Sequence, residues 1–361
     1  MAETTPIDLL SLTPDELRVS LEAHFAERGQ PTYRAKQVER WVYEGLACSL
    51  EEMTDLPAAE RLALAERYIL AEPEEQKVAV SSDKTAKHLW RLADGELVES
   101  FLIPSWKRLT LCISSQAGCA MGCTFCATGW GGFDRQLTPG EIVSQYRASK
   151  RWAEKNGYGA ISNIVYMGMG EPLSNRKAVH PSLTILNKGY GVGARRITVS
   201  TVGVVPGILE LAERPEQFRL ALSLHAPESK LRQELIPLEK RHNLTEVMAA
   251  LARFDDAGGK RITFEYTMIR GVNDDIRLAP KLAELAAQAR AFVNLIPYNP
   301  IPYKDWESSG PETLEEFSRI LEERGVSVAI RETRGQDIDA ACGQLRAHTL
   351  VQIDQKKTPE A

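Results

Sequence analysis

Three of the six cysteines of the chain lie within one short segment. Cys119, Cys123 and Cys126 follow the pattern C-x3-C-x2-C, in a loop that comes after a predicted strand. Thiolates bind soft metals, so three of them at this spacing predict a metal centre. Structural zinc sites normally have a fourth cysteine or histidine close by, and the next histidine here is His180. Ferredoxin clusters use a different spacing. The pattern therefore favours a [4Fe–4S] cluster with three cysteine ligands and one open iron, with zinc as the alternative.

Two further cysteines bear on chemistry. Cys112 lies on the predicted strand before the triplet, where a lone cysteine is most often a small buried apolar residue. Cys342 follows the last predicted strand, in a polar segment of Gly, Asp and Gln, and it precedes a glycine. A cysteine in this setting is accessible, so we expect Cys342 to act as a nucleophile or a carrier. Cys48 matches no motif, and we expect it to be buried.

The residues that follow the other strands are also unusual. Gly168-Met-Gly170-Glu171-Pro172 ends one strand; the glycines let the backbone approach a ligand, and Glu171 can accept a hydrogen bond from an ammonium group. An ordinary turn is the alternative. Later strand ends carry Ser200, the run Ser223-Leu224-His225, and Asn299. Each of these taken alone is more often a turn residue than a ligand contact.

The elements that would position these residues alternate regularly after about residue 108. Short β-branched runs are separated by stretches of helical period, and the runs cover 109–114, 163–168, 196–201, 219–225, 262–269, 292–297 and 326–332. Repeated β–α units predict an α/β fold with a parallel sheet and helices outside it, as an open or closed barrel. The chemistry of such barrels lies at the C-terminal ends of the strands, which is where the residues above fall.

The first part of the chain has a different pattern. Residues from about 7 to 70 read as helices, with an N-cap and proline at Thr13-Pro14. Residues 77–103 read as short strands, with hairpin turns at Asp83-Lys84 and Asp94-Gly95. We therefore predict a helical accessory domain over 1–75, a β-hairpin extension over 76–107, a barrel domain over 108–350 that includes the Cys342 segment, and a tail over 351–361.

Composition sets the class of protein. The 361 residues are 43% apolar and 26% charged, which is typical of a globular chain. There is no apolar run long enough for a membrane span and no secretory signal, so we expect a cytoplasmic protein. The net charge of −5 is uneven: residues 1–90 have 10 Lys and Arg against 17 Asp and Glu. Basic groups at Arg195-Arg196, Lys240–His242 and Lys260-Arg261 are candidates for phosphate contacts or for ordinary solvated surface. Charge alone neither requires nor excludes RNA.

The cysteine triplet resembles the signature of the radical S-adenosylmethionine (SAM) superfamily. In that superfamily the open iron binds the amino and carboxylate groups of SAM, and an electron from the cluster cleaves SAM to a 5′-deoxyadenosyl radical. By the same resemblance, Gly170 and Glu171 would hold the SAM amine. The remaining contacts to ribose, carboxylate and adenine would come from Ser200, Ser223, Leu224, His225 and Asn299.

The wider sequence resembles the RlmN/Cfr family of RNA adenosine methyltransferases. The matching segments are Asp337–Leu345, Thr110–Cys119, Arg34–Tyr43, Glu52–Pro57 and Val98–Pro104, and the resemblance runs from about residue 8 to about 350. It implies a partial (β/α)6 radical SAM barrel with an N-terminal helical domain and a β-hairpin extension. It also implies methylation of adenine C2 in 23S rRNA and in a subset of tRNAs, by a cytoplasmic monomer that receives electrons from a donor such as flavodoxin.

The resemblance assigns roles to three more residues. Cys342 would take a methyl group from one SAM, and a radical from a second SAM would activate that methyl group to attack the adenine. Glu99 would accept the ring proton, and Cys112 would attack the sulfur of Cys342 to release the product with a transient disulfide. Three alternatives remain: a Cfr-like C8 methyltransferase, a radical SAM enzyme that transfers no methyl group, and a non-enzymatic electron carrier or zinc-containing RNA-binding module. The helical N-terminal region and the context of Glu99 favour C2.

Overall fold

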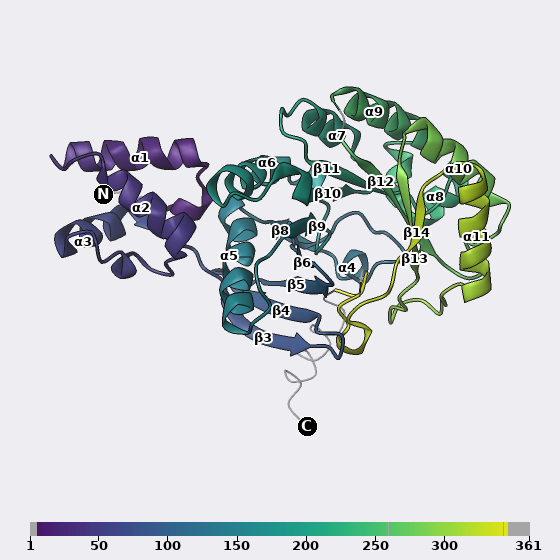
Figure 1. Cartoon of the computed structure of the whole chain (residues 1–361), viewed down its shortest axis with the longest axis horizontal. Helices are drawn as coiled ribbons and strands as arrows, with labels where there is room; N and C mark the ends of the chain where they lie inside the picture. Colours follow the sequence, from purple (N-terminus) through teal and green to yellow (C-terminus); the bar gives the residue numbers. More distant parts are fainter. Residues whose placement is uncertain (1–5, 259, 342, 346–361) are drawn as a thin grey trace.

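The N-terminal part of the chain is a small helical unit. The computed structural model describes residues 6–258, 260–341 and 343–345, and every structural statement below refers to these. The elements of the unit are β1 (Ile7–Asp8), α1 (Pro14–Glu27), α2 (Arg34–Arg40), α3 (Ala58–Arg67) and β2 (Tyr68–Ile69). Thr13 caps α1 in a capping box with Glu16, as the sequence predicts. Leu17, Leu21 and Phe25 belong to a hydrophobic cluster of this unit's own, at one end of the molecule (Figure 1).

A ten-stranded mixed sheet is the main sheet of the rest of the fold. Its strand order is β14-β13-β12-β11-β10-β9-β6-β5-β4-β3. The strands from β6 to β14 run parallel: β6 (Arg108–Cys112), β9 (Asn163–Tyr166), β10 (Ile197–Thr201), β11 (Arg219–Ser223), β12 (Ile262–Met268), β13 (Phe292–Pro297) and β14 (Val328–Ile330). These strands coincide with the β-branched runs, so the predicted α/β barrel is confirmed.

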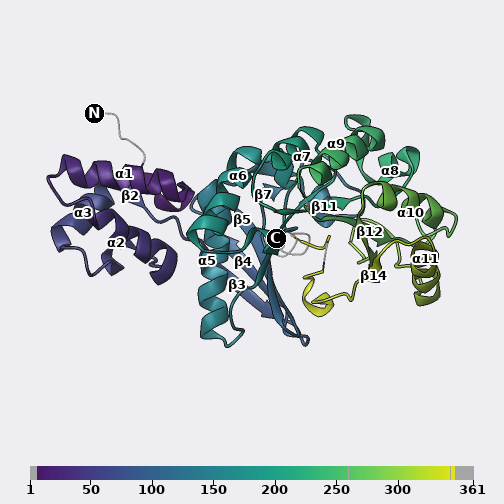
Figure 2. The ribbon, with the colours of Figure 1, turned by 45° about the horizontal axis from the view of Figure 1, so that its top comes forward.

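Helices connect the parallel strands and cover one face of the sheet. They are α5 (Pro139–Lys155), α6 (Arg176–Thr184), α7 (Val205–Ala212), α8 (Ser229–Leu235), α9 (Leu244–Asp256), α10 (Leu278–Gln288) and α11 (Pro311–Glu323). The chain thus makes six strand–helix crossovers within the described residues, with β14 as the final edge strand. Apolar side chains between these helices and the strands form the main core. Figure 2 shows the helices around the outside of the curved sheet.

The predicted hairpin extension joins this same sheet. β3 (Glu74–Val80), β4 (Ala86–Arg91) and β5 (Leu97–Ser105) pair antiparallel, and β5 then pairs antiparallel with β6. Phe101 of β5 lies opposite Cys112 of β6. The extension therefore lengthens the barrel wall on the side of its first parallel strand (Figure 1).

The last described residues cross the open side of the barrel. We call residues 331–341 and 343–345 the C-terminal strap. After β14 the strap runs to the turn between β3 and β4, where Gly335 N donates to Asp83 Oδ2 (3.0 Å) and Ser82 N donates to Asp337 Oδ2 (3.1 Å). It then reaches α4 (Ala127–Trp130), where Ala127 N donates to the carbonyl of Gly343 (2.6 Å). The strap thus links the two ends of the sheet (Figures 1 and 2).

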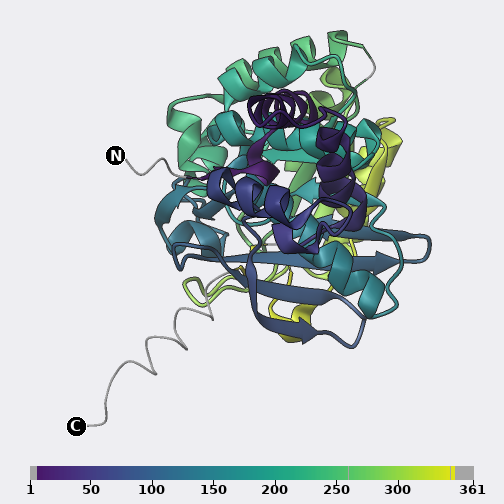
Figure 3. The same cartoon turned by 90° about the vertical axis from the view of Figure 1, so that its left-hand side faces the viewer.

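The helical unit packs against α5 and against the helical turn Ile185–Gly189 that follows α6. Gly140 N, in the first turn of α5, donates to Ser11 Oγ (3.0 Å), and Arg147 of the same helix reaches backbone carbonyls of the unit. Figure 3, seen from the outer end of the unit, shows its helices in front of the sheet. Among the described residues, the structure contains no helix with the length and apolar character needed to cross a membrane.

Candidate active site at the open face of the barrel

The cysteine loop is held by a short antiparallel pair. β7 (Gln116–Gly118) and β8 (Phe133–Gln136) bring its ends together, and Cys119 N donates to the carbonyl of Gly132 (2.7 Å). Gly129 packs so closely that a Cβ there would lie 3.1 Å from the backbone nitrogen and oxygen of Cys123. The loop is therefore compact, and it contains all three cysteines.

The three thiols share one cavity at the C-terminal ends of the parallel strands. Burial raises the pKa of Cys119 to about 12 and places that of Cys123 well above its ordinary value, and the nearby thiols of Cys126 and Cys119 add to the rise at Cys123. No three His, Cys, Asp or Glu side chains in the described part of the chain converge as a ready-made metal site. The triplet fits a cluster by the chemistry of its donors and their common cavity. A positive centre would stabilise the thiolates that burial disfavours.

The glycine segment after β9 forms the next part of the cavity wall. A Cβ on Gly168 would lie 2.6 Å from the carbonyl oxygen of Ile113, and a Cβ on Gly170, whose φ is +100°, would lie 2.5 Å from the Gln116 side chain. Both positions therefore require glycine, which explains their presence better than an ordinary turn does.

Glu171 is buried in this wall. Its carboxylate accepts hydrogen bonds from Leu173 N (3.0 Å) and Val202 N (2.9 Å), which link the loops after β9 and β10. Burial raises its pKa to about 7, while these backbone donors oppose the rise. The Thr201 hydroxyl also hydrogen-bonds to this carboxylate, whose two oxygens together retain acceptor capacity for an ammonium donor. The predicted role with the SAM amine is thus compatible with the bonds present.

The later strand ends bring most of the remaining predicted residues into the same cavity. Ser200, Ser223, His225 and Asn299 all line it. Leu224 does not: its side chain is fully buried in the main core, so only its backbone is available to a ligand.

His225 has a backbone φ of +54° and joins two parts of the site. Its Nδ1 accepts a hydrogen bond from Thr267 N (2.9 Å), so the neutral ring carries its hydrogen on Nε2. Burial lowers its pKa to about 3, which keeps the ring neutral. Phe125 of the cysteine loop packs edge-on against it, with ring centres 4.3 Å apart.

Cys112 and Glu99 lie beside the cavity rather than in its described wall. Cys112 is buried in an apolar cluster with Phe101, Ala340 and Leu345, so the strap covers it. Glu99 is 2% exposed on β5. Cys342 lies outside the described residues. Its neighbours in sequence reach the site from both sides, since Ala340 packs in the Cys112 cluster and Gly343 lines the cavity.

Two residues of the site, Glu265 and Arg232, carry no motif that predicts them from the sequence. Glu265 of β12 lines the cavity, accepts a hydrogen bond from Asn294 Nδ2 (2.9 Å), and lies 3.7 Å from the Arg331 guanidinium. Burial raises its pKa. The signal for Glu265 was a single acid within the apolar run 262–269. Arg232, fully buried, donates to the carbonyl of Val202 (2.6 Å) and supports the loop after β10.

Cys48 does not follow its prediction. It is exposed, in the loop after the helical residues 34–45, where its backbone nitrogen donates to Glu52 (3.2 Å). The expectation that it is buried is wrong because Ala47 and Leu50 occupy the buried positions of this loop, which leaves the Cys48 side chain on the solvent side.

Known proteins match this architecture over nearly its whole length. Residues 113–279 match the family model of the radical SAM superfamily, and residues 7–70 match that of the ribosomal RNA large subunit methyltransferase N-terminal domain. The chain is 48% identical over 345 residues to a probable dual-specificity RNA methyltransferase RlmN of Gemmatimonas aurantiaca, covering 95% of this chain and 94% of that protein. It is 42% identical over 352 residues to a dual-specificity RNA methyltransferase RlmN of Nitratidesulfovibrio vulgaris, covering 95% and 96%.

A solved structure gives the same picture. The chain superposes on a radical SAM methyltransferase from Sphaerobacter thermophilus with a TM-score of 0.89 and 44% identity, covering 95% of this chain and 100% of that chain. The agreement extends over the helical unit and the barrel together, because so little of either chain is left out.

Proposed function

Because the chain belongs to the RlmN family of radical SAM RNA methyltransferases, we propose that it methylates C2 of a specific adenosine in 23S rRNA and of an adenosine in a subset of tRNAs. The dual substrate follows the names of the relatives, which are described as dual-specificity enzymes. The choice of C2 as the methylated carbon is supported by the match to the N-terminal domain. It is also supported by Glu99, a buried acid on the strand that pairs with the strand of Cys112.

One observation carries the proposal. The strap folds over Cys112, and it also contributes Gly343, which follows Cys342 in the sequence, to the cavity that holds the cysteine triplet. A radical SAM enzyme that transfers no methyl group needs no cysteine on such a segment. The arrangement supports a reaction that uses a carrier thiol, a resolving thiol and a radical in one place.

The residues divide the chemistry. A [4Fe–4S] cluster on Cys119, Cys123 and Cys126, together with two molecules of SAM per turnover, would supply both the methyl group and the radical that activates it. Cys342 would carry the methyl group, and Cys112 would attack its sulfur to release the product. Glu99 would accept the proton from the adenine ring. The apolar cluster around Cys112 would exclude water from the adduct.

Ligand contacts would come from the cavity wall. Gly170 and Glu171 would hold the amine of SAM; its other groups would meet Ser200, Ser223, His225 and Asn299, with Leu224 contributing its backbone. The helical unit would recognise the shape of the RNA, since RNA recognition commonly targets loops with splayed bases. We expect a low-potential electron donor of the flavodoxin type, a monomeric enzyme, and a cytoplasmic site of action where these RNAs occur.

The test is nucleoside analysis in a bacterial strain deleted for its own enzyme of this family. Complementation with this gene should restore 2-methyladenosine in both 23S rRNA and tRNA, measured by mass spectrometry of digested RNA. The Cys342→Ala variant should restore none, and the Cys48→Ala variant should match the wild type. Finding only 8-methyladenosine would assign the Cfr-like reaction instead, and product in rRNA alone would remove the tRNA half of the proposal.

A further inference from the structure

Lys87 connects the predicted proton acceptor to the strap. Its ammonium nitrogen lies 3.7 Å from Glu99 Oε1, and the same nitrogen donates a hydrogen bond to the carbonyl of Asp339 (3.2 Å). Asp339 is three positions before Cys342 in the sequence. One side chain therefore touches both Glu99 and the segment that bears the predicted methyl carrier.

Both side chains of this contact are shielded from water, which strengthens the attraction between their charges. The side chain of Glu99 is 2% exposed and that of Lys87 is 15% exposed. An ionised carboxylate is costly to bury without a cation or hydrogen-bond donors, and the attraction between opposite charges is stronger where water is excluded. The Lys87 ammonium therefore stabilises Glu99 as the carboxylate, which is the form able to take a proton.

The position of Lys87 in the sheet is equally specific. Lys87 of β4 lies opposite Phe101 of β5, and Phe101 lies opposite Cys112 of β6. Glu99 is two residues before Phe101, so its side chain shares the face of the sheet that Phe101 and Cys112 use. The strap crosses this face. Cys112 of β6 lies on this face, and Lys87 of β4 lies there within ion-pair distance of Glu99.

We infer that Lys87 is a positioning residue for the removal of the adenine proton. Resting on the proposed function, this assigns Lys87 the task of holding Glu99 ionised and at a fixed distance from the strap once the methylene carbon has bonded to adenine C2. In that step the C2–H bond breaks, an O–H bond forms on Glu99, and the bonding electron pair stays on the ring. Lys87 neither gains nor loses a proton.

The strap does not depend on Lys87 alone. Asp83 and Asp337 tie it to the turn between β3 and β4, and Gly343 ties it to α4. Loss of the ammonium should therefore leave the strap in place. Lys77 of β3 offers a matched control, because it is an exposed lysine on the neighbouring strand.

The experiment compares Lys87→Met, Lys87→Arg and Lys77→Met in the reconstituted holoenzyme. Lys87→Met should load iron, cleave SAM and methylate Cys342 like the wild type. Under single-turnover conditions with an RNA substrate, it should release methylated adenosine about 10-fold more slowly or worse and accumulate a covalent protein–RNA adduct, seen on a denaturing gel. The acidic limb of its rate–pH profile should move to higher pH. Lys87→Arg should recover most of the rate, and Lys77→Met should match the wild type.

Each other result has a definite meaning. A wild-type rate without adduct in Lys87→Met would overturn the inference. So would a parallel loss of Cys342 methylation and SAM cleavage, because it would make Lys87 merely structural. A rate loss with an unchanged pH profile would also overturn it. If the wild-type enzyme itself formed no methylated adenosine, the proposed function would fail and the inference would fail with it.

Discussion

Arg147 of α5 and Glu72, just after the helical unit, form a buried ion pair that joins the two parts of the chain. Arg147 is fully buried, and its Nε donates to Glu72 Oε1 (2.5 Å). Arg151, one turn further along α5, donates to Glu72 Oε2 (2.6 Å). The Arg147 guanidinium also donates to the carbonyls of Val42 and Ala47. Arg147, assisted by Arg151, thus satisfies several acceptors at the junction between α5 and the helical unit.

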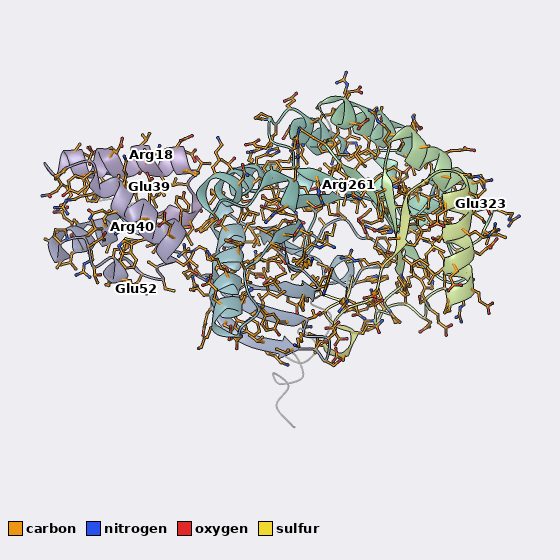
Figure 4. The ribbon with its side chains drawn as sticks, viewed as in Figure 1. Arg18, Glu39, Arg40, Glu52, Arg261 and Glu323 are labelled. Atoms are coloured by element: carbon orange, nitrogen blue, oxygen red, sulfur yellow. The ribbon has the colours of Figure 1, made fainter. Side chains whose placement is uncertain are left out.

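Replacing Arg147 should therefore be severe. Arg147→Met leaves the Ala47 carbonyl without its donor, leaves the Val42 carbonyl with only the longer bond from Tyr190 Oη (3.4 Å), and weakens the pairing of Glu72. We expect a loss of about 3 to 5 kcal/mol in the free energy of unfolding. Urea denaturation measures it. The control is Arg18→Met, which breaks an exposed pair with Glu39 (Figure 4) and should lower the free energy of unfolding far less. Equal effects of the two variants would contradict the assigned role.

Replacing one cysteine of the triplet should cause a selective loss of iron. Cys123→Ser removes a thiol from the loop, and the chain should fall from about four iron atoms per molecule to near zero after anaerobic reconstitution. Iron analysis and visible absorption measure this. Cys48→Ser, at an exposed cysteine outside the cavity, should keep the full iron content. Full iron loading of Cys123→Ser would exclude Cys123 as a ligand.

Replacing Gly170 should weaken the binding of SAM. Gly170→Ala places a methyl group against the Gln116 side chain and also strains a φ of +100°. The loop that carries Glu171 must shift, and we expect SAM affinity to fall about 10-fold or more in equilibrium dialysis of the reconstituted protein. Gly157→Ala separates strain from crowding, because Gly157 has a φ of +73° with open space around it. It should lose roughly 1 to 2 kcal/mol of stability yet bind SAM normally.

Cys112 predicts an arrest after carbon–carbon bond formation. Without its thiol the sulfur of Cys342 has no attacking group, so Cys112→Ala should retain Cys342 methylation but release no methylated RNA. A covalent protein–RNA species should persist on a denaturing gel, also after treatment with a thiol reductant. A variant that still released product at the wild-type rate would remove Cys112 from the reaction.

The burial of His88 should make the free energy of unfolding depend on pH. The ring is fully buried, stacked on Trp90 with centres 4.9 Å apart and edge-on to Trp152, with the exposed Glu75 carboxylate 3.9 Å away. Burial lowers its pKa to about 4. The unfolded chain takes up this proton below about pH 6.5 and the folded chain does not, so stability is present above that pH and falls as the pH drops toward 4, by roughly 3 kcal/mol.

Urea denaturation at pH 7.5 and pH 5 measures this difference. His88→Gln should show a smaller fall in the free energy of unfolding between the two pH values than the wild type does. The comparison between the two proteins removes the contributions of the other titrating groups. An identical fall in both would show that His88 is protonated in the folded state.

Sequence alone was sufficient for the parts of this structure that depend on local pattern. The parallel strands are buried runs of β-branched residues, and the cysteine triplet and the glycine segment carry their own spacing. Thr13 and Thr138 each begin a helix with a capping box, which is a signal within four residues. These features need no knowledge of distant parts of the chain.

Contacts between residues that are far apart in the sequence could not be predicted from the sequence. Asp83 meets Gly335 and Lys87 meets Asp339, pairs that are 252 residues apart, and no local pattern encodes them. Leu224 illustrates a second limit, because it lies just after the end of β11, where its side chain is buried in the core while its neighbours Ser223 and His225 line the cavity.

The anchorage of the strap also has a consequence for folding during synthesis. The β3–β4 turn and the strap residue bonded to it are 252 residues apart, so a nascent chain can fold its helical unit and much of its sheet before the strap is made and covers the Cys112 face. Cluster insertion can precede closure in that interval, through the side the strap later crosses. A chain released before the strap is made would fold its barrel and leave the Cys112 face open to solvent.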